Sequence, residues 1–212
     1  MSFLFEEFPK IPRYKREVIV TEKIDGSNAQ VAWFELTTTD LLEAAEVDPS
    51  CLGVFRGKEI GDTPLALYAG SRNRWIRPEK NADNFGFAAW VLAHAEELQA
   101  LGPGRHFGEW FGAGIQRTYY LPEKHFALFN VARWNTENPN KPACCDVVPV
   151  LARGEAIDDE AIMEALSREG SRMVPGFRDP EGIIVFHSAS RQMYKRTFEQ
   201  DGGKWRTLKV AV

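Results

Sequence analysis

The chain has 212 residues, of which 44% are apolar and 26% charged, so it is long enough to bury one sizeable hydrophobic core. Its net charge of −4 is unlike that of proteins that hold a long duplex through phosphate neutralisation alone. No apolar run approaches the roughly 20 residues of a membrane span. The opening MSFLFEEFPK also lacks the basic start of a signal peptide. We therefore expect a cytoplasmic protein with no membrane partner.

If a nucleic acid is bound, its contacts must come from a local cluster of positive charge or from a partner protein. Three clusters are candidates: Arg13, Lys15 and Arg16 near the start; Arg72, Arg74 and Arg77 in SRNRWIR; and the basic run from Lys195 to Lys209. Each cluster is also compatible with an ordinary solvated face.

The first predicted elements are two strands in residues 17–35. The runs EVIVTEKI and NAQVAWFE alternate apolar and polar residues, and DGS separates them. Because Asp-Gly favours tight turns, this pattern predicts a strand, a turn and a second strand. A short helix follows over 40–46, capped by Thr39 or Asp40, and further strand candidates lie in 50–70, between glycines and Pro64.

The clearest helical pattern covers residues 84–100. Its apolar residues recur at helical spacing, it opens at Asp83 or Asn84, and Gly102-Pro103 stops it. A second helix is predicted over 158–169, with Asp158 as its cap.

The rest of the chain is strand-like, with candidates at 106–112, 125–134, 181–187 and 191–199. Many strands with long excursions between them and only two or three helices indicate an α+β fold with antiparallel sheets. No domain boundary is evident, so one domain over residues 1–212 is expected.

Lys23 is the first candidate for chemistry. An amine attacks only after losing its proton, and nearby cations or a metal favour that neutral form. Lys23 ends a predicted strand, and the turn IDGSN after it would hold the lysine rigidly, with Asp25 and Asn28 close by. This segment alone is weak evidence, because a lysine beside a turn is usually an ordinary surface residue.

Three later segments carry further candidates. In FGEWFG, Glu109 lies between glycines and aromatic residues, which favours a strand passing close to a ligand, although an exposed glutamate at a strand end is the alternative. In PEGIIVFH, Glu181 precedes an apolar strand, where a carboxylate could hold a divalent metal. In MYKRTF, the alternating neighbours of Lys195 suggest an inward-facing amine that meets an anion such as a phosphate.

The order of these segments is more specific than any one of them. The series KxDGxN, SRN, FGExFG, FxLFNV, EGxxV and a lysine on the last strand resembles the motifs of the covalent nucleotidyltransferase superfamily. It is most similar to the RNA ligases of the T4 RNA ligase 2-like group, over about residues 20–200. The resemblance implies an antiparallel-sheet nucleotidyltransferase domain, ATP-grasp-like, with a few flanking helices, and an ATP-dependent RNA ligase that uses Mg²⁺ or Mn²⁺.

The resemblance also assigns roles near the lysine. Lys23 would accept AMP, and Glu22 would help to define the purine pocket. Asn28 fits the RNA ligase variant of the first motif, whereas DNA ligases and capping enzymes more often have arginine there.

Further roles follow from the other motifs. Arg72 would contact the sugar and phosphate of the nucleotide, with Arg56 as a rival, and Glu109 would bind the ribose. Phe129 would stack on the adenine, with Phe126 as the alternative.

The last two motifs would act on the phosphates. Glu181 would be associated with the metal, and Lys195 would contact the α-phosphate. The fifth motif of the group often has a second lysine where this chain has Thr197; Arg196 and Lys204 are the candidates to replace it.

The expected substrate is RNA with 5′-phosphate and 3′-hydroxyl ends. We expect no separate C-terminal domain to grip it, so a partner protein is a possible source of that grip. The alternatives are a DNA ligase or GTP-using capping enzyme, and a catalytically reduced module that binds or senses a nucleotide.

Overall fold

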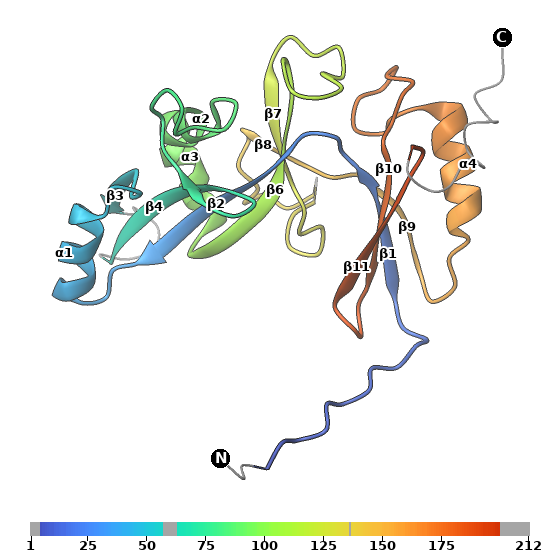
Figure 1. Ribbon diagram of the computed structural model, residues 1–212, viewed down its shortest axis with the longest axis horizontal. Coiled ribbons are helices and arrows are strands. Elements are labelled where there is room, and N and C mark those ends of the chain that lie inside the picture. Colours follow the sequence, from blue (N-terminus) through green and yellow to red (C-terminus); the bar gives the residue numbers. More distant parts are fainter. Residues whose placement is uncertain (1–4, 57–62, 136, 200–212) are drawn as a thin grey trace. The chain divides into compact units, whose positions relative to one another are not determined.

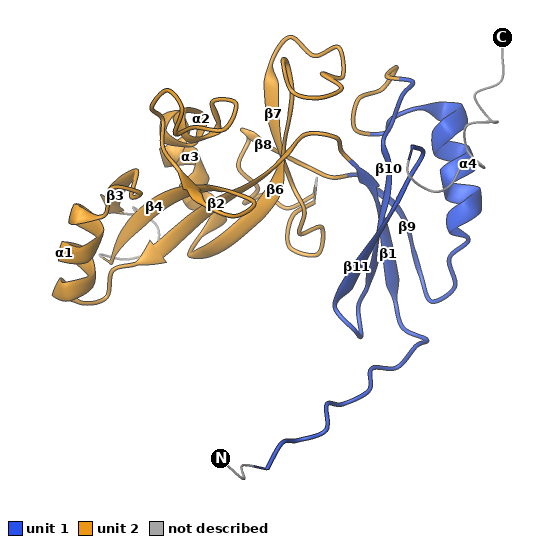
Figure 2. Cartoon of the chain, in the orientation of Figure 1, with its two compact units in different colours: residues 1–23, 149–172, 178–212 blue, residues 24–148, 173–177 orange. Residues whose placement is uncertain are grey.

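The computed structural model describes residues 5–56, 63–135 and 137–199. Lys204 and the end of the basic C-terminal run lie outside them. The chain divides into two compact units: unit 1 contains residues 1–23, 149–172 and 178–212, and unit 2 contains residues 24–148 and 173–177 (Figure 2). None of the helices in the described segments is long and apolar enough to cross a membrane. The expectation of one nucleotidyltransferase domain over 1–212 stays a prediction.

Unit 1 is an antiparallel sheet with one helix packed on it. The strand order is β11-β10-β1-β9, with bounds Gln192–Thr197, Gly182–His187, Val18–Lys23 and Val150–Gly154 (Figure 1). Helix α4, Asp159–Glu169, covers one face, where Met163 and Leu166 pack against Val20 and Ile183. The predicted cap is confirmed, because the Asp158 side chain accepts a hydrogen bond from the Ala161 N–H.

The register of this sheet decides which residues share a face. Side chains alternate along β1, so Val20 and Glu22 lie on the α4 side, whereas Thr21 and Lys23 lie on the opposite face. Thr21 pairs with Ile184, which pairs with Lys195. Lys23 and Lys195 therefore belong to the same face.

Unit 2 is built on a larger sheet with the strand order β3-β4-β2-β6-β7-β8. These strands are Gly53–Arg56, Pro64–Ser71, Ser27–Glu35, Gly104–Gly112, Lys124–Leu128 and Cys145–Val147, and β5, Trp75–Ile76, pairs with β4. The pairing is antiparallel except between β7 and β8. The predicted α+β class with antiparallel sheets is confirmed.

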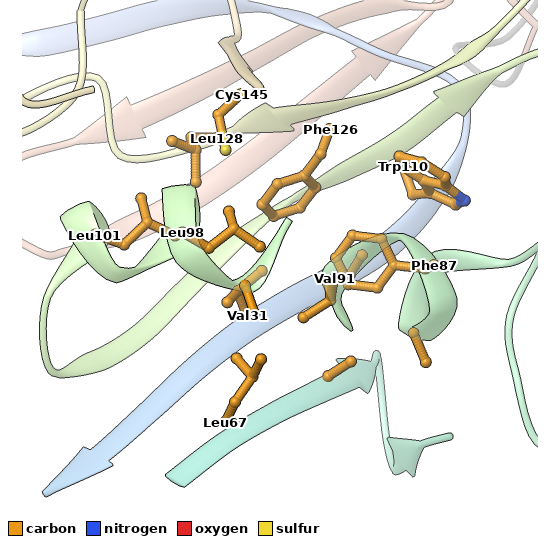
Figure 3. Packing of buried hydrophobic residues seen from close by; sticks show 14 of the residues in the cluster. Val31, Leu67, Phe87, Val91, Leu98, Leu101, Trp110, Phe126, Leu128 and Cys145 are labelled. Carbon is orange, nitrogen blue, oxygen red and sulfur yellow. The ribbon is translucent and has the colours of Figure 1, made fainter. Parts of the chain in front are cut away.

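One face of this sheet carries the main core of unit 2. Helices α2, Phe87–Ala93, and α3, Ala95–Leu98, with the 3₁₀ turn Gln99–Leu101, cover it. Figure 3 shows the packing, in which Phe87 and Val91 of α2 face Trp110 and Phe126 of the sheet. Each fully buried aromatic or aliphatic side chain contributes about 1.5–3 kcal/mol to folding.

The prediction of one continuous helix over 84–100 is wrong, because the structure has two shorter helices there. Gly86 is left-handed, with φ +81°, so helical geometry begins only at Phe87, and the helix is interrupted at His94. Asp83 still acts as a cap, because its carboxylate accepts from the Ala88 and Ala89 N–H groups at 2.8 and 3.1 Å.

The opposite face of the sheet is covered at one end by α1, Thr39–Val47. There Ala45 packs with Ala32, Ala66 and Tyr68. The helix was predicted correctly, but Thr38 rather than Thr39 or Asp40 caps it, accepting from the Leu41 N–H.

Two strand predictions need correction. Strands β1 and β2 do not pair with each other: β1 pairs with β9 and β10, and β2 with β4 and β6. The segment IDG therefore leads from one sheet to another and is not a hairpin turn. The strand predicted over 125–134 ends at Leu128, and the chain then turns, because the N–H groups of Arg133 and Trp134 donate to the Asn130 carbonyl.

Candidate active site

Lys23 and Glu181 form the central contact of unit 1. Lys23 is the last residue of β1, and Glu181 immediately precedes β10, the neighbouring strand. The Lys23 Nζ lies 2.6 Å from Glu181 Oε2, and the two side chains are 22% and 19% exposed. The structure thus brings together two residues that are 158 positions apart and that the sequence predicted separately.

The close approach of β11 explains why a glycine, Gly182, follows Glu181. Gly182 pairs with Lys23 on one side and with Thr197 on the other. A Cβ at position 182 would lie 2.0 Å from the Arg196 carbonyl oxygen and 2.8 Å from the Thr197 Cα, and φ is +151°. Only glycine permits β11 to approach so closely beside the lysine.

Lys195 is exposed on the face of the sheet opposite α4, the face to which Lys23 belongs. The expectation of an inward-facing side chain is therefore wrong, and the contact of Lys195 with a phosphate stays a prediction. Thr197, the departure from the fifth motif, shares this face and is buried, and its hydroxyl has no hydrogen-bond partner in the described part of the chain. Arg196 points the other way and pairs with Asp159 of α4, so it does not replace the missing lysine.

Glu22 is the most buried charged residue among the predicted ones, with 1% of its surface exposed. Its carboxylate accepts from the Ser171 hydroxyl at 2.6 Å and from the Arg172 N–H at 2.7 Å. These bonds lie on the α4 side of the sheet, away from the Lys23 face. The structure shows Glu22 positioning residues 171–172, and the purine contact stays a prediction.

In unit 2, Asn28 and Glu109 are direct cross-strand neighbours of β2 and β6, so their side chains share a face. Both are partly buried. Gly26 lies close to the same strand, since a Cβ there would come within 2.5 Å of the Trp110 carbonyl oxygen and 3.0 Å of the Glu109 Cγ. The glycine of KxDG is therefore required by the approach of the loop to β6.

Asp25 is held by a loop that sequence reasoning missed. Its N–H donates to the Tyr119 hydroxyl at 2.7 Å, and its Oδ2 lies 3.0 Å from the Arg117 Nε. Residues Gln116, Thr118, Tyr119 and Tyr120 of this loop all have positive φ, between 43° and 56°. Such strain persists only where surrounding contacts impose it. No local sequence pattern identifies Arg117 or Tyr119 as partners of the KxDG segment.

Arg72 is exposed in the turn that joins β4 to β5, directly after Ser71, which pairs with Ala29 beside Asn28. Its rival, Arg56, pairs with Pro64 at the other end of β4. Pro64 and Ser71 are seven residue steps apart along the strand, roughly 23 Å at 3.3 Å per residue. The geometry of unit 2 therefore favours Arg72 as the arginine nearer to Asn28.

The two phenylalanine candidates also differ. Phe126 is completely buried in the core between Phe87 and Trp90, on the helix-covered face. Phe129 is partly exposed, and its N–H is anchored to the Phe107 carbonyl at 2.9 Å. Of the two residues, only Phe129 is exposed to solvent at all, which favours it for the contact with adenine.

Glu181 fits a hard cation such as Mg²⁺, which prefers oxygen ligands and usually keeps several waters while binding one or two carboxylates and the phosphates of a substrate. Among the described residues, no three histidine, cysteine, aspartate or glutamate side chains come together as a metal cage. The metal contact of Glu181 stays a prediction.

Comparison with known proteins gives a consistent picture. The RNA ligase family matches residues 16–203. Three structures of Naegleria gruberi RNA ligase mutants are similar in fold. Two of them contain ATP and Mn, with sequence identities of 17% and 18% and TM-scores of 0.52 and 0.51. The third contains AMP and Mn, with a sequence identity of 18% and a TM-score of 0.51. Each match covers 87% of this chain but only 50% of the other. The chain thus spans about half the length of these proteins. No curated protein matches it.

Proposed function

Because this chain belongs to the RNA ligase family, we propose that it joins RNA ends with ATP through a covalent lysyl-AMP at Lys23. The observation that carries the proposal is the placement of Lys23. Its amine lies at the end of β1, 2.6 Å from Glu181. The loop that follows is fixed because Gly26 packs closely against β6 and because Tyr119 and Arg117 contact Asp25. A nucleophile held this rigidly is oriented before its substrate binds.

In the first step, the Lys23 amine attacks the α-phosphorus of ATP. A bond forms between Nζ and phosphorus, the bond from that phosphorus to the bridging oxygen breaks, and pyrophosphate leaves with its electron pair. The amine loses a proton to solvent. Lys195, on the same face of the sheet, supplies positive charge for the α-phosphate. A magnesium ion held by Glu181 would neutralise negative charge on the phosphates.

The remaining predicted residues would bind the nucleotide. We assign Glu109 to the ribose hydroxyls, with Asn28 beside it, because the register places both on one face. We assign Phe129 to the adenine ring and Arg72 to the sugar and phosphate. The buried hydroxyl of Thr197 would donate a hydrogen bond to a phosphate, at the position where related motifs have a lysine. Glu22 would act on the purine pocket through the segment that it anchors.

In the later steps, the AMP passes from Lys23 to a 5′-phosphate of RNA, and a 3′-hydroxyl then displaces it. The fold likeness to RNA ligase structures that contain ATP or AMP supports the choice of nucleotide. The choice of RNA rests on the family match and on Asn28 in the first motif.

The test of the first step is incubation with magnesium and either α-labelled ATP or α-labelled GTP. We expect a base-stable label from ATP that is absent in Lys23→Ala. A label from GTP alone would indicate a capping-type enzyme, and a label that persists in Lys23→Ala would refute the assignment. The test of the later steps is sealing of nicked duplex RNA, nicked DNA and single-stranded RNA, in which activity on DNA alone would contradict the proposal. No label and no sealing would leave a nucleotide-binding module.

A further inference from the structure

Unit 2 carries an arginine stacked on two aromatic rings. The guanidinium carbon of Arg105 lies 5.1 Å from the centre of the Phe34 ring and 4.9 Å from that of Trp75. Its Nη1 donates to Gln30 Oε1 at 3.2 Å. These contacts fix the plane of the guanidinium while the residue stays exposed. No carboxylate forms an ion pair with Arg105 in the described segments, so its charge is available to an anion from outside.

An exposed aromatic side chain lies next to this arginine. Phe107 is 46% exposed in the middle of β6, two residues from Arg105 and therefore on the same face of the strand. Phe107 pairs with Gln30, which pairs with Gly70. The Gln30 side chain lies over Gly70, since a Cβ at position 70 would come within 2.7 Å of the Gln30 Cγ. We call Arg105, Phe107, Phe34, Trp75 and Gln30 the arginine-aromatic face.

The arginine-aromatic face lies along the same row of β6 side chains as Glu109, the residue predicted to bind the ribose. Along β6, Arg105, Phe107 and Glu109 point to the same side in steps of roughly 7 Å. Asn28 pairs with Glu109 at the end of the row. The turn that carries Arg72 and Arg74 joins β4 to Trp75, so two more arginines lie close to the face in the chain. Cationic side chains beside exposed aromatic ones are typical of surfaces that bind single-stranded nucleic acids.

We propose that the arginine-aromatic face binds a single strand of the RNA substrate, with Phe107 stacking on a base and Arg105 contacting a phosphate. This inference rests on the proposed function, since it concerns the second substrate of the same reaction. It also accounts for nucleic-acid binding by a chain whose net charge is −4, because the positive charge is needed only locally. The segment SRNRWIR is one of the three basic clusters of the sequence, and Trp75 of that segment is part of the face.

The experiment measures binding of a short 5′-phosphorylated, single-stranded oligoribonucleotide by fluorescence anisotropy at several salt concentrations. We expect Arg105→Ala and Phe107→Ala each to weaken binding about tenfold. Arg105→Ala should also reduce the slope of log affinity against log salt by about one, because one phosphate contact is lost, whereas Phe107→Ala should leave that slope unchanged.

Two matched variants serve as controls. Arg168→Ala removes an exposed arginine from α4 in unit 1, and Phe85→Asn removes an aromatic residue of similar exposure, 48%, ahead of α2. Asparagine is chosen because residue 85 has φ +51°. Both should bind RNA as the wild type does. If Arg105→Ala and Phe107→Ala bound RNA as tightly as the two controls do, the proposal would be overturned.

Self-adenylylation separates this inference from the proposed function. All four variants should accept label from ATP at the wild-type rate, since none of the replaced residues is assigned to the nucleotide. If the wild type itself takes no label, the proposed function fails, and the RNA affinities of the variants still decide whether this face binds a strand. Because the replaced side chains are exposed, far-ultraviolet circular dichroism should show unchanged folding.

Discussion

The Nζ of Lys23 and the Oε2 of Glu181 are 2.6 Å apart, in a pair that is only about one fifth exposed to solvent. The contact fixes the position of the Lys23 amine at the end of β1. The same carboxylate is the group that we propose would hold magnesium, an ion that prefers oxygen ligands.

This relationship predicts the behaviour of Glu181→Gln. The amide keeps the size of the side chain but loses the charge that would bind a metal. We expect the rate of label transfer from ATP to Lys23 to fall at least about tenfold, as is usual when a group that stabilises developing charge is removed. Raising the magnesium concentration should not restore it. The matched control is Glu164→Gln on the exposed side of α4, which should react like the wild type. A normal rate in Glu181→Gln would contradict the metal assignment.

Gly182 gives a second prediction, which concerns stability. In Gly182→Ala the new methyl group would lie 2.0 Å from the Arg196 carbonyl, so β11 would have to move away from β10. We expect a loss of about 3 kcal/mol in the free energy of unfolding, measured by urea denaturation, together with impaired adenylylation because Lys195 moves with its strand.

The control for this variant lies in the same unit. A Cβ at Gly154 would meet nothing closer than 3.5 Å, so Gly154→Ala should be nearly neutral. Equal stability of the two variants would show that β11 is not held against β10 as described.

The parts of the fold that sequence patterns predicted correctly are those with strong local signals. Helix α4 has a capping aspartate and helical periodicity, and β6, β10 and β11 alternate or are uniformly apolar. Strands β5, β8 and β9 have at most five residues, too few for a period to be recognised. The turn between β1 and β2 was misread because Asp-Gly is compatible with both a hairpin and a crossover. The choice depends on β10, some 160 residues away.

The candidate site shows the same limit. The motifs identified Lys23 and Glu181, but only the pairing of β1 with β10 brings them together. The neighbour of Lys23, Glu22, points to the other face of the strand, as alternation along β1 requires, and the motif alone did not reveal this. Tyr119 was missed entirely, because its contact with Asp25 depends on a loop whose positive φ angles have no signature in these residue types.

Tyr119 leads to a third prediction. Tyr119→Phe keeps the buried ring but removes the hydroxyl that accepts from the Asp25 N–H. An unsatisfied, partly buried amide should lower the free energy of unfolding by about 1–2 kcal/mol. Because the KxDG backbone loosens, adenylylation should slow as well. Tyr120→Phe is the control, since Tyr120 is 84% exposed, and it should alter neither measurement. Equal effects of the two substitutions would mean that the hydroxyl of Tyr119 does not hold Asp25.

His106 gives the last prediction, on the dependence of stability on pH. Burial lowers the pKa of this histidine in the folded protein, and the charge of Arg133 lowers it further, against a hydrogen bond to the Gly102 carbonyl that raises it. In the unfolded chain its pKa is about 6.5. Above that pH the histidine is neutral in both states. As the pH falls below it, the unfolded state binds the proton first, so stability is lost until the lower pKa of the folded state is reached.

In His106→Gln, the decline in the free energy of unfolding between about pH 7 and pH 5 should be shallower than in the wild type. A decline unchanged in His106→Gln would assign the effect to other groups.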